Sequence, residues 1–383
     1  MEQYGKVKIT QKISLIFLVP SLQFGGAERV AVRLLPHLAE NFNLVLTTLE
    51  DRFLYHFPQE IKKVSFSPPL NNPYSHIIRI PYHVFRLSRL VITTRAQIVL
   101  SFMEQANIIN IMSSFFKNHR AIISQRIMPQ QQYGHKGWMG KLIFFASMCY
   151  YPKASHIVAV SKEIMRYLIS EYKVSPEKVS FIPNPVDLKE LEREMVRPLP
   201  KGVKKPFLLH VGRLNMAQKG QDILLKAFAK LIQKWPELHL VLVGDGPDKE
   251  KILHLIKFLG IEGRVYLAGW QQNVAAFMAN AEMLLFPSRY EGWPNVLLEA
   301  MACRCPVVAA DCLSGPREII GNNRYGVLVP VDSVEALANT ASRLLSRSDL
   351  VEHLREVGHK RAREFSVERI ASRYEEVIRS AAH

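Results

Sequence analysis

Short apolar runs alternate along the chain with segments whose apolar residues recur at helical spacing. Runs of this length, rich in Val, Ile and Leu, predict strands buried on both faces of a parallel sheet. We expect strands at residues 13–19, 44–48, 98–102, 121–124 and 156–160, and again at 207–211, 238–243, 265–268, 283–286 and 307–310. Helices are predicted between them, among others at 28–40, 221–233, 249–259 and 295–302. The alternation predicts the α/β class.

A change of composition separates the two groups of strands. Ile182-Pro-Asn-Pro-Val186 is a turn signal, because Asn-Pro favours turn initiation. The polar stretch 187–205 follows, and a strand then starts afresh. We therefore expect two α/β domains joined near 185–205. Ligands of open α/β sheets bind beyond the carboxyl ends of the strands, so the cleft between the domains is the expected active site.

Composition narrows the class of protein. The chain of 383 residues is 48% hydrophobic and 22% charged, which excludes a disordered protein. Four Cys exclude a disulfide scaffold and favour a reducing compartment. The apolar run at 13–19 leads into Pro20 rather than a cleavage site, and no stretch approaches the roughly 20 apolar residues that span a bilayer. We expect a cytoplasmic protein.

The charge is high and unevenly spread. With 50 Lys and Arg against 34 Asp and Glu, the net charge is +16. Residues 51–150 hold 12 basic and 3 acidic residues, and 12 − 3 gives +9. Such a basic region suits nucleic acid, an anionic membrane surface or a phosphorylated substrate.

A first motif follows the strand predicted at 207–211. Gly212 permits a tight exit, and Arg213 and Lys219 lie in a loop before a helix that starts near Asp222. Two cations beside a helix amino terminus form an anion site, for which a diphosphate is the obvious guest. The alternative is a solvated loop that happens to carry both cations.

A second motif follows the strand predicted at 283–286. Glu291 and Glu299 are separated by seven residues, and the helix is expected to begin at Pro294 or Asn295. A carboxylate at position 299 is suited to accept hydrogen bonds from a ribose diol. The alternatives are an exposed helical Glu299 and a Glu291 that merely complements the helix dipole.

Together these motifs resemble the donor site of retaining GT-B glycosyltransferases of family 4. Other segments agree with that family in chain order, so that the resemblance covers residues 13–380. They are Gly25-Gly-Ala-Glu28, His156-Ile-Val-Ala-Val-Ser161, the turn at 182–187, Val243-Gly-Asp-Gly-Pro247 and Asp311-Cys-Leu-Ser-Gly-Pro-Arg-Glu318. The last is similar to a segment of members that build lipid-linked oligosaccharides and surface polysaccharides.

The resemblance implies a GT-B fold, with two Rossmann-like domains facing across a cleft. Residues 1–190 would form the acceptor-side domain, 191–365 the nucleotide-sugar domain, and 366–383 a helix that packs back on the first. The implied reaction is retaining transfer of a hexose or N-acetylhexosamine from a nucleotide diphosphate sugar, preferably UDP-linked, to a lipid-diphosphate-linked saccharide acceptor.

The resemblance also assigns roles to residues. Glu291, Arg213 and Lys219 would be catalytic, with both cations on the diphosphate. Glu299 would hold the donor ribose. The remaining donor-side residues would be Gly25, Gly26, Gly212, Gly292, Trp293, Pro294 and Asn295. The alternative for the glycine pair is a turn without a ligand.

On the acceptor side the chain departs from the family. Many members place a His after an amino-domain strand, but the stretch Leu100-Ser-Phe-Met-Glu-Gln-Ala-Asn107 has none. Glu104 or Gln105 is expected to face the cleft instead, and Arg126 to reach the acceptor's phosphate. The alternative for Arg126 is an ordinary surface charge.

We expect neither a metal nor a cofactor. The chain has no Asp-x-Asp pair to chelate a cation on a diphosphate, and Cys303, Cys305 and Cys312 lack a fourth zinc ligand at a convincing spacing. Arg213 and Lys219 would neutralise the diphosphate instead.

Two other functions compete with the leading one. An epimerase of nucleotide sugars would share the fold, and a basic nucleic-acid-binding protein has only the net charge in its favour, since no finger or RNA motif is present. We expect no nucleic-acid partner.

The basic region predicts a membrane partner instead. Residues 77–92 carry Arg79, Arg86 and Arg89 among large apolar residues, and residues 138–151 are apolar, with Lys136 and Lys141 near their start. Both segments could simply be helices packed on the sheet. With the +9 of this region, they favour peripheral docking on the anionic inner face of the cell membrane.

Overall fold

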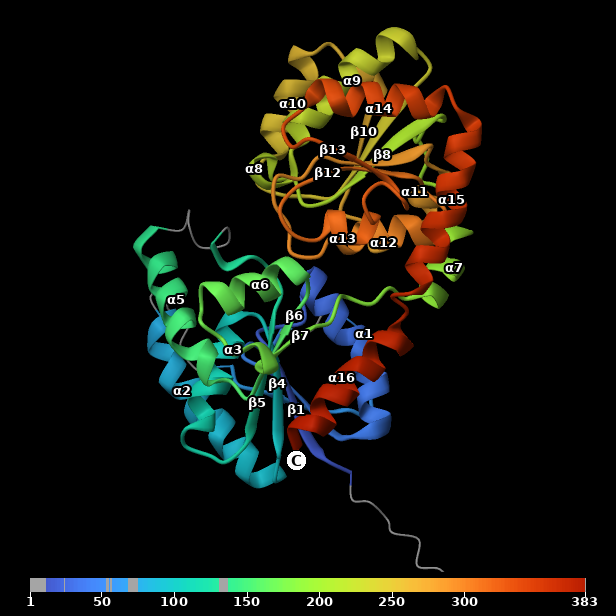
Figure 1. The fold of residues 1–383 in the computed structure, drawn as a ribbon. Helices are drawn as coiled ribbons and strands as arrows, with labels where there is room; N and C mark the ends of the chain where they lie inside the picture. Colours follow the sequence, from blue (N-terminus) through green and yellow to red (C-terminus); the bar gives the residue numbers. More distant parts are fainter. Residues whose placement is uncertain are drawn as a thin grey trace, which may run out of the picture.

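A computed structural model describes residues 12–23, 25–52, 55, 57–67, 75–130 and 137–382, and these form two parallel sheets one above the other in Figure 1. The first sheet has the strand order β3-β2-β1-β4-β5-β6-β7. Its strands are β1 (Ser14–Val19), β2 (Asn43–Thr48), β3 (Lys62–Ser65), β4 (Ile98–Phe102), β5 (Arg120–Gln125), β6 (His156–Ala159) and β7 (Val179–Phe181). This is the doubly wound order of nucleotide-binding folds.

The second sheet repeats the arrangement with the order β10-β9-β8-β11-β12-β13. Its strands are β8 (Phe207–Val211), β9 (His239–Val243), β10 (Val265–Gly269), β11 (Met283–Phe286), β12 (Val307–Ala310) and β13 (Val327–Val329). The prediction of an α/β protein with two Rossmann-like sheets is confirmed. The first sheet ends at Phe181 and the second begins at Phe207, while the domain limits at 190 and 365 stay a prediction.

Helices cover both faces of each sheet. The amino-terminal part contains α1 (Gly26–Asn41), α2 (Ser75–Thr94), α3 (Glu104–Ser114), α5 (Gly137–Tyr150) and α6 (Lys162–Ser170). Residues 182–187, called the crossover below, leave the first sheet, and α7 (Leu188–Met195) follows them. The carboxyl-terminal part contains α8 (Met216–Lys219), α9 (Gln221–Lys234), α10 (Lys249–Phe258), α11 (Ala275–Asn280), α12 (Asn295–Ala302), α13 (Pro316–Ile320), α14 (Val334–Leu345) and α15 (Ser348–Arg363). Short 3₁₀ turns lie at Tyr151–Lys153, Pro176–Lys178 and Glu262–Arg264.

The last helix, α16 (Val367–Ala382), returns to the first sheet. Figure 1 shows it in red beside α1 and the strands of the amino-terminal part. Ile370, Tyr374 and Ile378 are buried in the same core as Phe17 of β1 and Leu34 of α1. Burial of such side chains is the main stabilising contribution, at about 1.5–3 kcal/mol each, so this helix ties the end of the chain to its beginning.

Further contacts join the two parts beside the crossover. The backbone N–H of Lys162, at the start of α6, donates to the Glu318 carboxylate of α13 at 2.9 Å and 3.0 Å. The hydroxyls of Ser161 and Ser314 are 2.6 Å apart. A carboxylate at a helix amino terminus satisfies unpaired N–H groups and complements the dipole. Glu318 thereby holds a helix of the opposite part.

Candidate active site

The predicted site lies where the loops after β8, β9 and β11 leave the second sheet. The N–H of Gly212 donates to the carbonyl of Val243 at 2.9 Å, so the first two loops run side by side. Gly244 has φ of 140°, and a side chain there would overlap the carbonyl oxygen of Gly212. Only glycine fits such a backbone approach. The loops are therefore packed against one another before any ligand binds.

The two predicted diphosphate cations differ in their surroundings. Arg213 is exposed, and among the described residues its guanidinium has no hydrogen bond or ion pair. Lys219 was expected in a loop, but it is the last residue of the short helix α8. That helix forms because Asn215 caps its start, accepting from the Gln218 N–H at 3.0 Å, and Gly220 ends it in the left-handed conformation.

Lys219 forms a salt bridge with Glu291. Its Nζ lies 2.6 Å from Oε1 of Glu291, and both side chains are largely buried, at 16% and 9% exposed. Gly212 lies beneath this lysine, because a Cβ at that position would be 3.6 Å from Lys219 Cδ. Glu291 is therefore paired with a lysine from the other motif, and the roles predicted for Glu291, Lys219 and Arg213 stay predictions.

Arg289 joins the two motifs, and the sequence analysis missed it. Its guanidinium bonds both carboxylate oxygens of Asp222 at 3.0 Å and 2.8 Å, and Asp332 at 2.6 Å. Its backbone N–H donates to the Gln218 carbonyl at 2.8 Å. Paired donors of this kind fix geometry as well as charge. No spacing in the sequence distinguishes Arg289 from a surface arginine.

Glu299 is buried, so the interpretation as an exposed helical residue is wrong. Its Oε1 accepts from Arg33 at 3.1 Å and from Arg29 at 3.3 Å, and both arginines lie on α1 of the other sheet. Burial alone raises the pKa of Glu299, but the two arginines outweigh it and hold the pKa below its ordinary value. The four-residue spacing of Arg29 and Arg33 after the glycine pair is the signal that could have found them.

The glycine pair and Asn295 meet across the cleft. The Gly26 carbonyl accepts from Asn295 Nδ2 at 3.4 Å, whereas the space a Gly25 side chain would need is filled by the Glu28 carboxylate. Asn184 of the crossover donates to Asn295 Oδ1 at 2.6 Å. The loop after β1 therefore faces the start of α12 directly. The predicted contact of these glycines with donor stays a prediction.

Arg126 lies inside this interface. Its guanidinium is buried, donates to Asn184 Oδ1, and stacks 4.3 Å from the centre of the Phe102 ring. A side chain on Gly292 would overlap the Arg126 carbonyl oxygen, so the loops after β5 and β11 touch. The interpretation of Arg126 as a surface charge is wrong, and its contact with an acceptor stays a prediction.

Glu104 belongs to a buried polar network. It accepts from Gln125 Nε2 at 2.9 Å, and Gln125 Oε1 accepts from the Tyr151 hydroxyl at 2.8 Å. Gln105 is half-buried. Met103, just before them, has φ of 74°, a conformation that non-glycine residues adopt at a cost. The loop after β4 is thus held from below, and the roles predicted for Glu104 and Gln105 stay predictions.

The remaining predicted residues shape the loop before α12. Trp293 is buried between Phe181 and Phe365, with ring centres 5.8 Å and 5.6 Å away. Pro294 is the residue before the first turn of α12, where a missing N–H costs nothing. The Trp293 ring therefore anchors this loop on both the end of β7 and the segment before α16.

His210 lies under the site and was not predicted. It is buried, and its Nδ1 donates to the Leu285 carbonyl at 3.0 Å. Burial lowers the pKa of His210 to about 4. The ring is therefore neutral at pH 7 and adds no charge beneath Lys219.

No group of three or more His, Cys, Asp or Glu side chains that could hold a metal occurs among the described residues. Cys303, Cys305 and Cys312 are buried, and burial raises the pKa of each thiol. Among the helices that the structure describes, none has the length and apolar character to cross a membrane.

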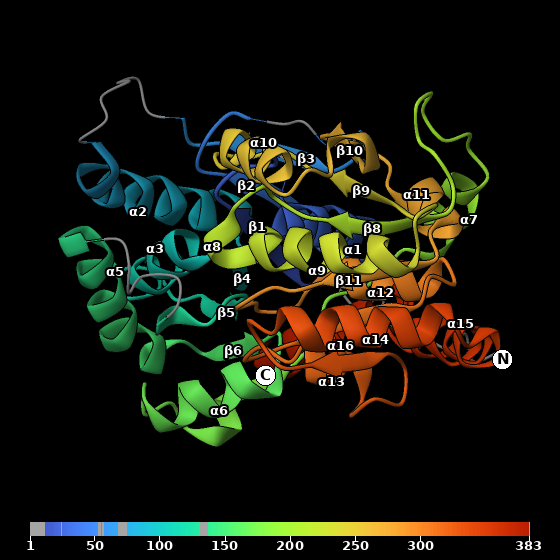
Figure 2. The ribbon, with the colours of Figure 1, turned by 90° about the horizontal axis from the view of Figure 1, so that it is seen from above.

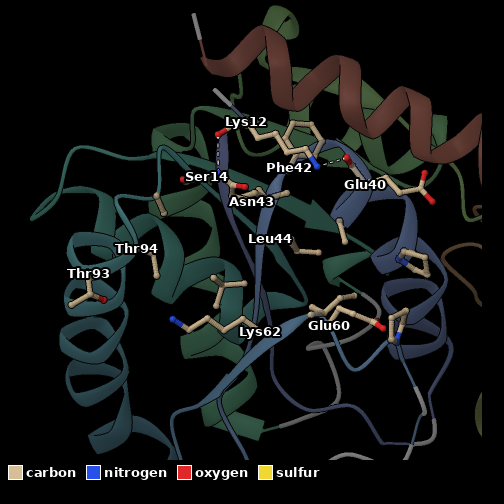
Figure 3. A pocket seen from close by; sticks show the side chains of 17 residues that line it. Lys12, Ser14, Glu40, Phe42, Asn43, Leu44, Glu60, Lys62, Thr93 and Thr94 are labelled. Carbon is tan, nitrogen blue, oxygen red and sulfur yellow. Dashed lines mark hydrogen bonds between the residues drawn. The ribbon is translucent and has the colours of Figure 1, made fainter. Parts of the chain in front are cut away.

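A cavity elsewhere in the molecule is lined by none of the residues of the candidate site. This cavity of about 740 Å³ is lined by Ser14, Asn43 and Lys62, the first residues of β1, β2 and β3, which are labelled in Figure 3. The ammonium of Lys12, another lining residue, donates to the Glu40 carbonyl at 2.7 Å. The cavity lies at the amino ends of these strands, at the opposite end from the loops of the candidate site.

Comparison with known proteins agrees with this geometry. The family model for glycosyl transferases group 1 matches residues 192–361, and that for glycosyltransferase family 4 matches residues 24–190. The chain is 31% identical to the N-acetylgalactosamine-N,N'-diacetylbacillosaminyl-diphospho-undecaprenol 4-alpha-N-acetylgalactosaminyltransferase of Campylobacter jejuni, over 94% of this chain and 97% of that protein.

Solved structures share the fold. The Anabaena protein HepE, in complex with UDP, superposes with a TM-score of 0.78 at 21% identity, covering 96% of this chain and all (100%) of HepE. The lipopolysaccharide outer core galactosyltransferase WaaB has a TM-score of 0.74 at 24% identity, covering 96% of this chain and 99% of WaaB. The chain therefore belongs to glycosyltransferase family 4, a retaining class of glycosyltransferases with the GT-B fold.

Proposed function

We propose that this glycosyltransferase moves a hexose or N-acetylhexosamine from a UDP-linked sugar to a lipid-diphosphate-linked saccharide. The observation that carries the proposal is the pair of cations at the carboxyl end of β8. Arg213 is exposed and unpaired among the described residues, and Lys219 lies 2.6 Å from Glu291. HepE, of the same fold, has been solved with UDP and with UDP-glucose, which favours a nucleotide diphosphate sugar here as well.

In this proposal the cations stabilise the leaving diphosphate. As the bond between the sugar's anomeric carbon and the diphosphate breaks, negative charge grows on the phosphate oxygens. Arg213 and Lys219, whose backbone the packed loops hold, act on that charge more strongly in the transition state than in the ground state. The acceptor hydroxyl attacks from the face on which the diphosphate leaves, and its proton passes to a phosphate oxygen. Configuration is thereby retained.

Glu291 and Glu299 would each contact a different part of the donor outside the diphosphate. Glu291 lies beside Lys219, where the transferred sugar would be, and its carboxylate can accept hydrogen bonds from sugar hydroxyls. Glu299 is ionised beside its arginines and would hold the ribose diol. With two organic cations at the diphosphate, the reaction proceeds without a metal.

The acceptor proposal draws on the Campylobacter relative, whose name describes transfer of N-acetylgalactosamine to an undecaprenol-diphosphate-linked sugar. The chain covers 97% of that protein, so the acceptor-side sheet is part of the match. The domain of residues 1–190 would bind the acceptor and that of 191–365 the donor.

A lipid-linked acceptor requires access to a membrane, and one side of the amino-terminal part has a suitable surface. Figure 2 shows α2, α3 and α5 next to one another there. Seven large apolar side chains on these helices, or directly after α3, are 46–71% exposed: Phe85, Ile92, Phe115, Phe116, Trp138, Leu142 and Phe145. Exposed apolar groups on this scale mark an interaction surface.

The charge of this surface favours an anionic membrane as its partner. Residues 75–153 contain ten basic residues and one acidic residue, Glu104, which is buried. Arg89 of α2, Lys141 of α5 and Lys153 of the turn after α5 are exposed. Arg86 is half-buried, with its guanidinium 5.5 Å from the Phe66 ring centre. Lys136 lies outside the described residues. The protein would act on the cytoplasmic face of the membrane.

The function is tested with a panel of UDP-sugars and an undecaprenyl-diphosphate-linked saccharide. We expect one or a few donors to yield a lipid-linked product whose new linkage keeps the donor's anomeric configuration, as read by NMR. No transfer from any donor, or an inverted linkage, would overturn the proposal. Donor incubated alone should not change, because formation of an epimer would favour the alternative enzyme.

A further inference from the structure

Glu299 is held by two arginines of the opposite domain. Oε1 of Glu299 accepts from Arg33 Nη1 at 3.1 Å and from Arg29 Nη1 at 3.3 Å. Because both guanidinium groups use the same oxygen, the other oxygen, Oε2, is not engaged by them. The side chains of Glu299 and Arg33 are each only 5% exposed. The contact is thus a buried ion pair between α12 and α1.

Arg33 has a second partner near the crossover. Its Nη2 donates to Oε2 of Glu190 at 3.0 Å, on α7. Arg33 therefore links three elements that lie far apart in the sequence: α1, α7 and α12. A buried arginine between two carboxylates has its charge compensated and its orientation fixed. The negative charge of Glu299 also stabilises the protonated form of Arg29 and thereby raises the pKa of Arg29.

The arginines also line a cavity between the domains. This space of about 970 Å³ is bounded by Arg29 and Arg33 on one side, by α7, and by Trp270 and Gln272 of the loop after β10. Neither Glu299 nor Arg213, Lys219 or Glu291 lines this space, so it is separate from the proposed donor site. Arg29 and Arg33 therefore contact Glu299 on one side and border this cavity on another.

We infer that Arg29 and Arg33 are positioning residues for the donor: by holding Oε1 of Glu299 from α1, they leave Oε2 fixed for the ribose diol. Nucleotide affinity would then depend on the amino-terminal domain as well as on the domain that carries the donor site. The inference rests on the proposed role of Glu299.

The physical reason lies in the freedom of the glutamate side chain. A free carboxylate on three rotatable bonds loses conformational entropy when it orders on a ligand, and fixing it beforehand removes that cost from binding. The two cations also keep the group ionised, which leaves it a pure hydrogen-bond acceptor, as a diol requires.

The test is the dissociation constant of UDP for the full-length protein, measured by calorimetry. We expect Arg33→Met to weaken UDP binding about tenfold. Glu299→Gln should weaken it by a similar factor, and the double variant should bind no more weakly than Glu299→Gln alone. Arg33→Lys should recover part of the loss, because lysine can pair with Glu299 but cannot bridge to Glu190 at the same time.

Two controls separate positioning from stability. Arg347→Met removes an arginine that pairs with Asp349 at 2.7 Å on the surface of α15, and it should leave UDP binding unchanged. Arg29, whose side chain is 28% exposed, tolerates replacement better than Arg33. Arg29→Met should therefore fold even if Arg33→Met does not, and it should bind UDP more weakly than the unsubstituted protein.

The outcomes distinguish the inference from the function on which it rests. Unchanged UDP binding in Glu299→Gln would remove the proposed ribose contact itself. Weaker binding in Glu299→Gln, with unchanged binding in Arg29→Met and Arg33→Met, would overturn only the positioning role. Tighter binding in the arginine variants would also overturn it, because the arginines would then compete with the ligand for Glu299.

Discussion

Lys219 Nζ lies 2.6 Å from Oε1 of Glu291, so a cation of the first donor motif is paired with a carboxylate of the second. The pair sits where the proposed diphosphate and sugar meet. A diphosphate would offer Lys219 a stronger partner than one carboxylate, and Glu291 would then be free to accept from the sugar. Arg213 needs no such exchange, because it is unpaired among the described residues.

Loss of either cation should slow transfer. We expect Arg213→Ala and Lys219→Ala each to lower kcat by about 10²–10³, since removing one preorganised charge donor costs about 2.7–4 kcal/mol of barrier. The measurement is steady-state transfer with saturating donor. Lys226→Ala, an exposed lysine of α9, is the matched control and should keep full turnover. Near-normal rates in both site variants would remove the diphosphate assignment.

Substitutions of the two glutamates should affect different steps of the reaction. Glu299→Gln is expected to weaken donor binding, because the ribose loses its charged acceptor, while Glu291→Gln should chiefly slow the single-turnover rate. Gln is chosen over Ala at position 299, since a truncated side chain would remove the buried carboxylate that pairs with Arg33 and Arg29, and breaking a buried ion pair costs about 3–5 kcal/mol. Donor affinity and single-turnover rates measure both effects. The reverse pattern would mean that the two roles are exchanged.

Much of the fold could be predicted because its central strands are buried on both faces. The runs at 98–102, 207–211 and 283–286 match β4, β8 and β11 at both ends. The edge strands β3, β7 and β13 were missed. They are only three or four residues long and partly exposed. Lys or Ser interrupts the apolar residues of β3 and β7, and the apolar run of β13 is three residues long.

The site could be predicted only where chemistry follows local spacing. Arg213, Lys219 and Glu291 stand next to glycines, and Glu299 follows Glu291 about one turn into the next helix, which makes them visible in the sequence. The partners that come from other elements were not visible. Arg33 is 266 residues from Glu299, and Arg289 is 67 residues from Asp222, and only the packing of the two sheets brings these pairs together.

Chelation should leave the activity intact. With Arg213 and Lys219 at the diphosphate, we expect the initial rate in excess EDTA to stay within about twofold of the untreated rate. Reactions with added magnesium or manganese serve as comparison. Full loss in EDTA that either metal restores would show that a metal performs the role assigned to the two cations.

The basic, aromatic surface should bind anionic vesicles. Arg89→Glu with Lys141→Glu is expected to lower binding to phosphatidylglycerol-containing vesicles at least tenfold, since each nearby cation contributes about 1 kcal/mol at such a surface. Transfer to a water-soluble acceptor should not change. Arg86 is left intact, because its guanidinium packs on Phe66 and Tyr82.

Lys226→Glu with Lys257→Glu, on the exposed faces of α9 and α10, is the charge-matched control for that experiment. Co-sedimentation at physiological salt provides the readout. Equal recovery of the protein with neutral and anionic vesicles would exclude the electrostatic contribution to binding. Absence of binding to either kind of vesicle would contradict the membrane proposal.

Acid should destabilise the protein through its buried histidines. Burial lowers the pKa of His210 to about 4, so below the unfolded-state pKa of 6.5 the unfolded chain takes up a proton that the folded chain does not. The contribution is fully present above pH 6.5 and is lost as the pH falls toward 4. Between pH 7 and pH 5 it amounts to about 2 kcal/mol.

Urea unfolding at both pH values measures this effect. In His210→Asn the free energy of unfolding should fall less between pH 7 and pH 5 than in the unsubstituted protein. His83 and His119, whose pKa values are also lowered to about 4 by burial, keep part of the dependence in that variant. An identical pH dependence in both proteins would contradict the assignment of a neutral, buried His210.

A comparison of UDP with uridine tests most directly whether Arg213 and Lys219 bind the diphosphate. If Arg213 and Lys219 form the diphosphate site, calorimetry should show UDP binding to the full-length protein at least a hundredfold more tightly than uridine, or about 2.7 kcal/mol. Arg213→Ala should remove a large part of that difference while leaving the affinity for uridine unchanged. Equal affinities for UDP and uridine would contradict the assignment of Arg213 and Lys219 to the diphosphate. An Arg213→Ala protein that still prefers UDP as strongly would contradict it as well.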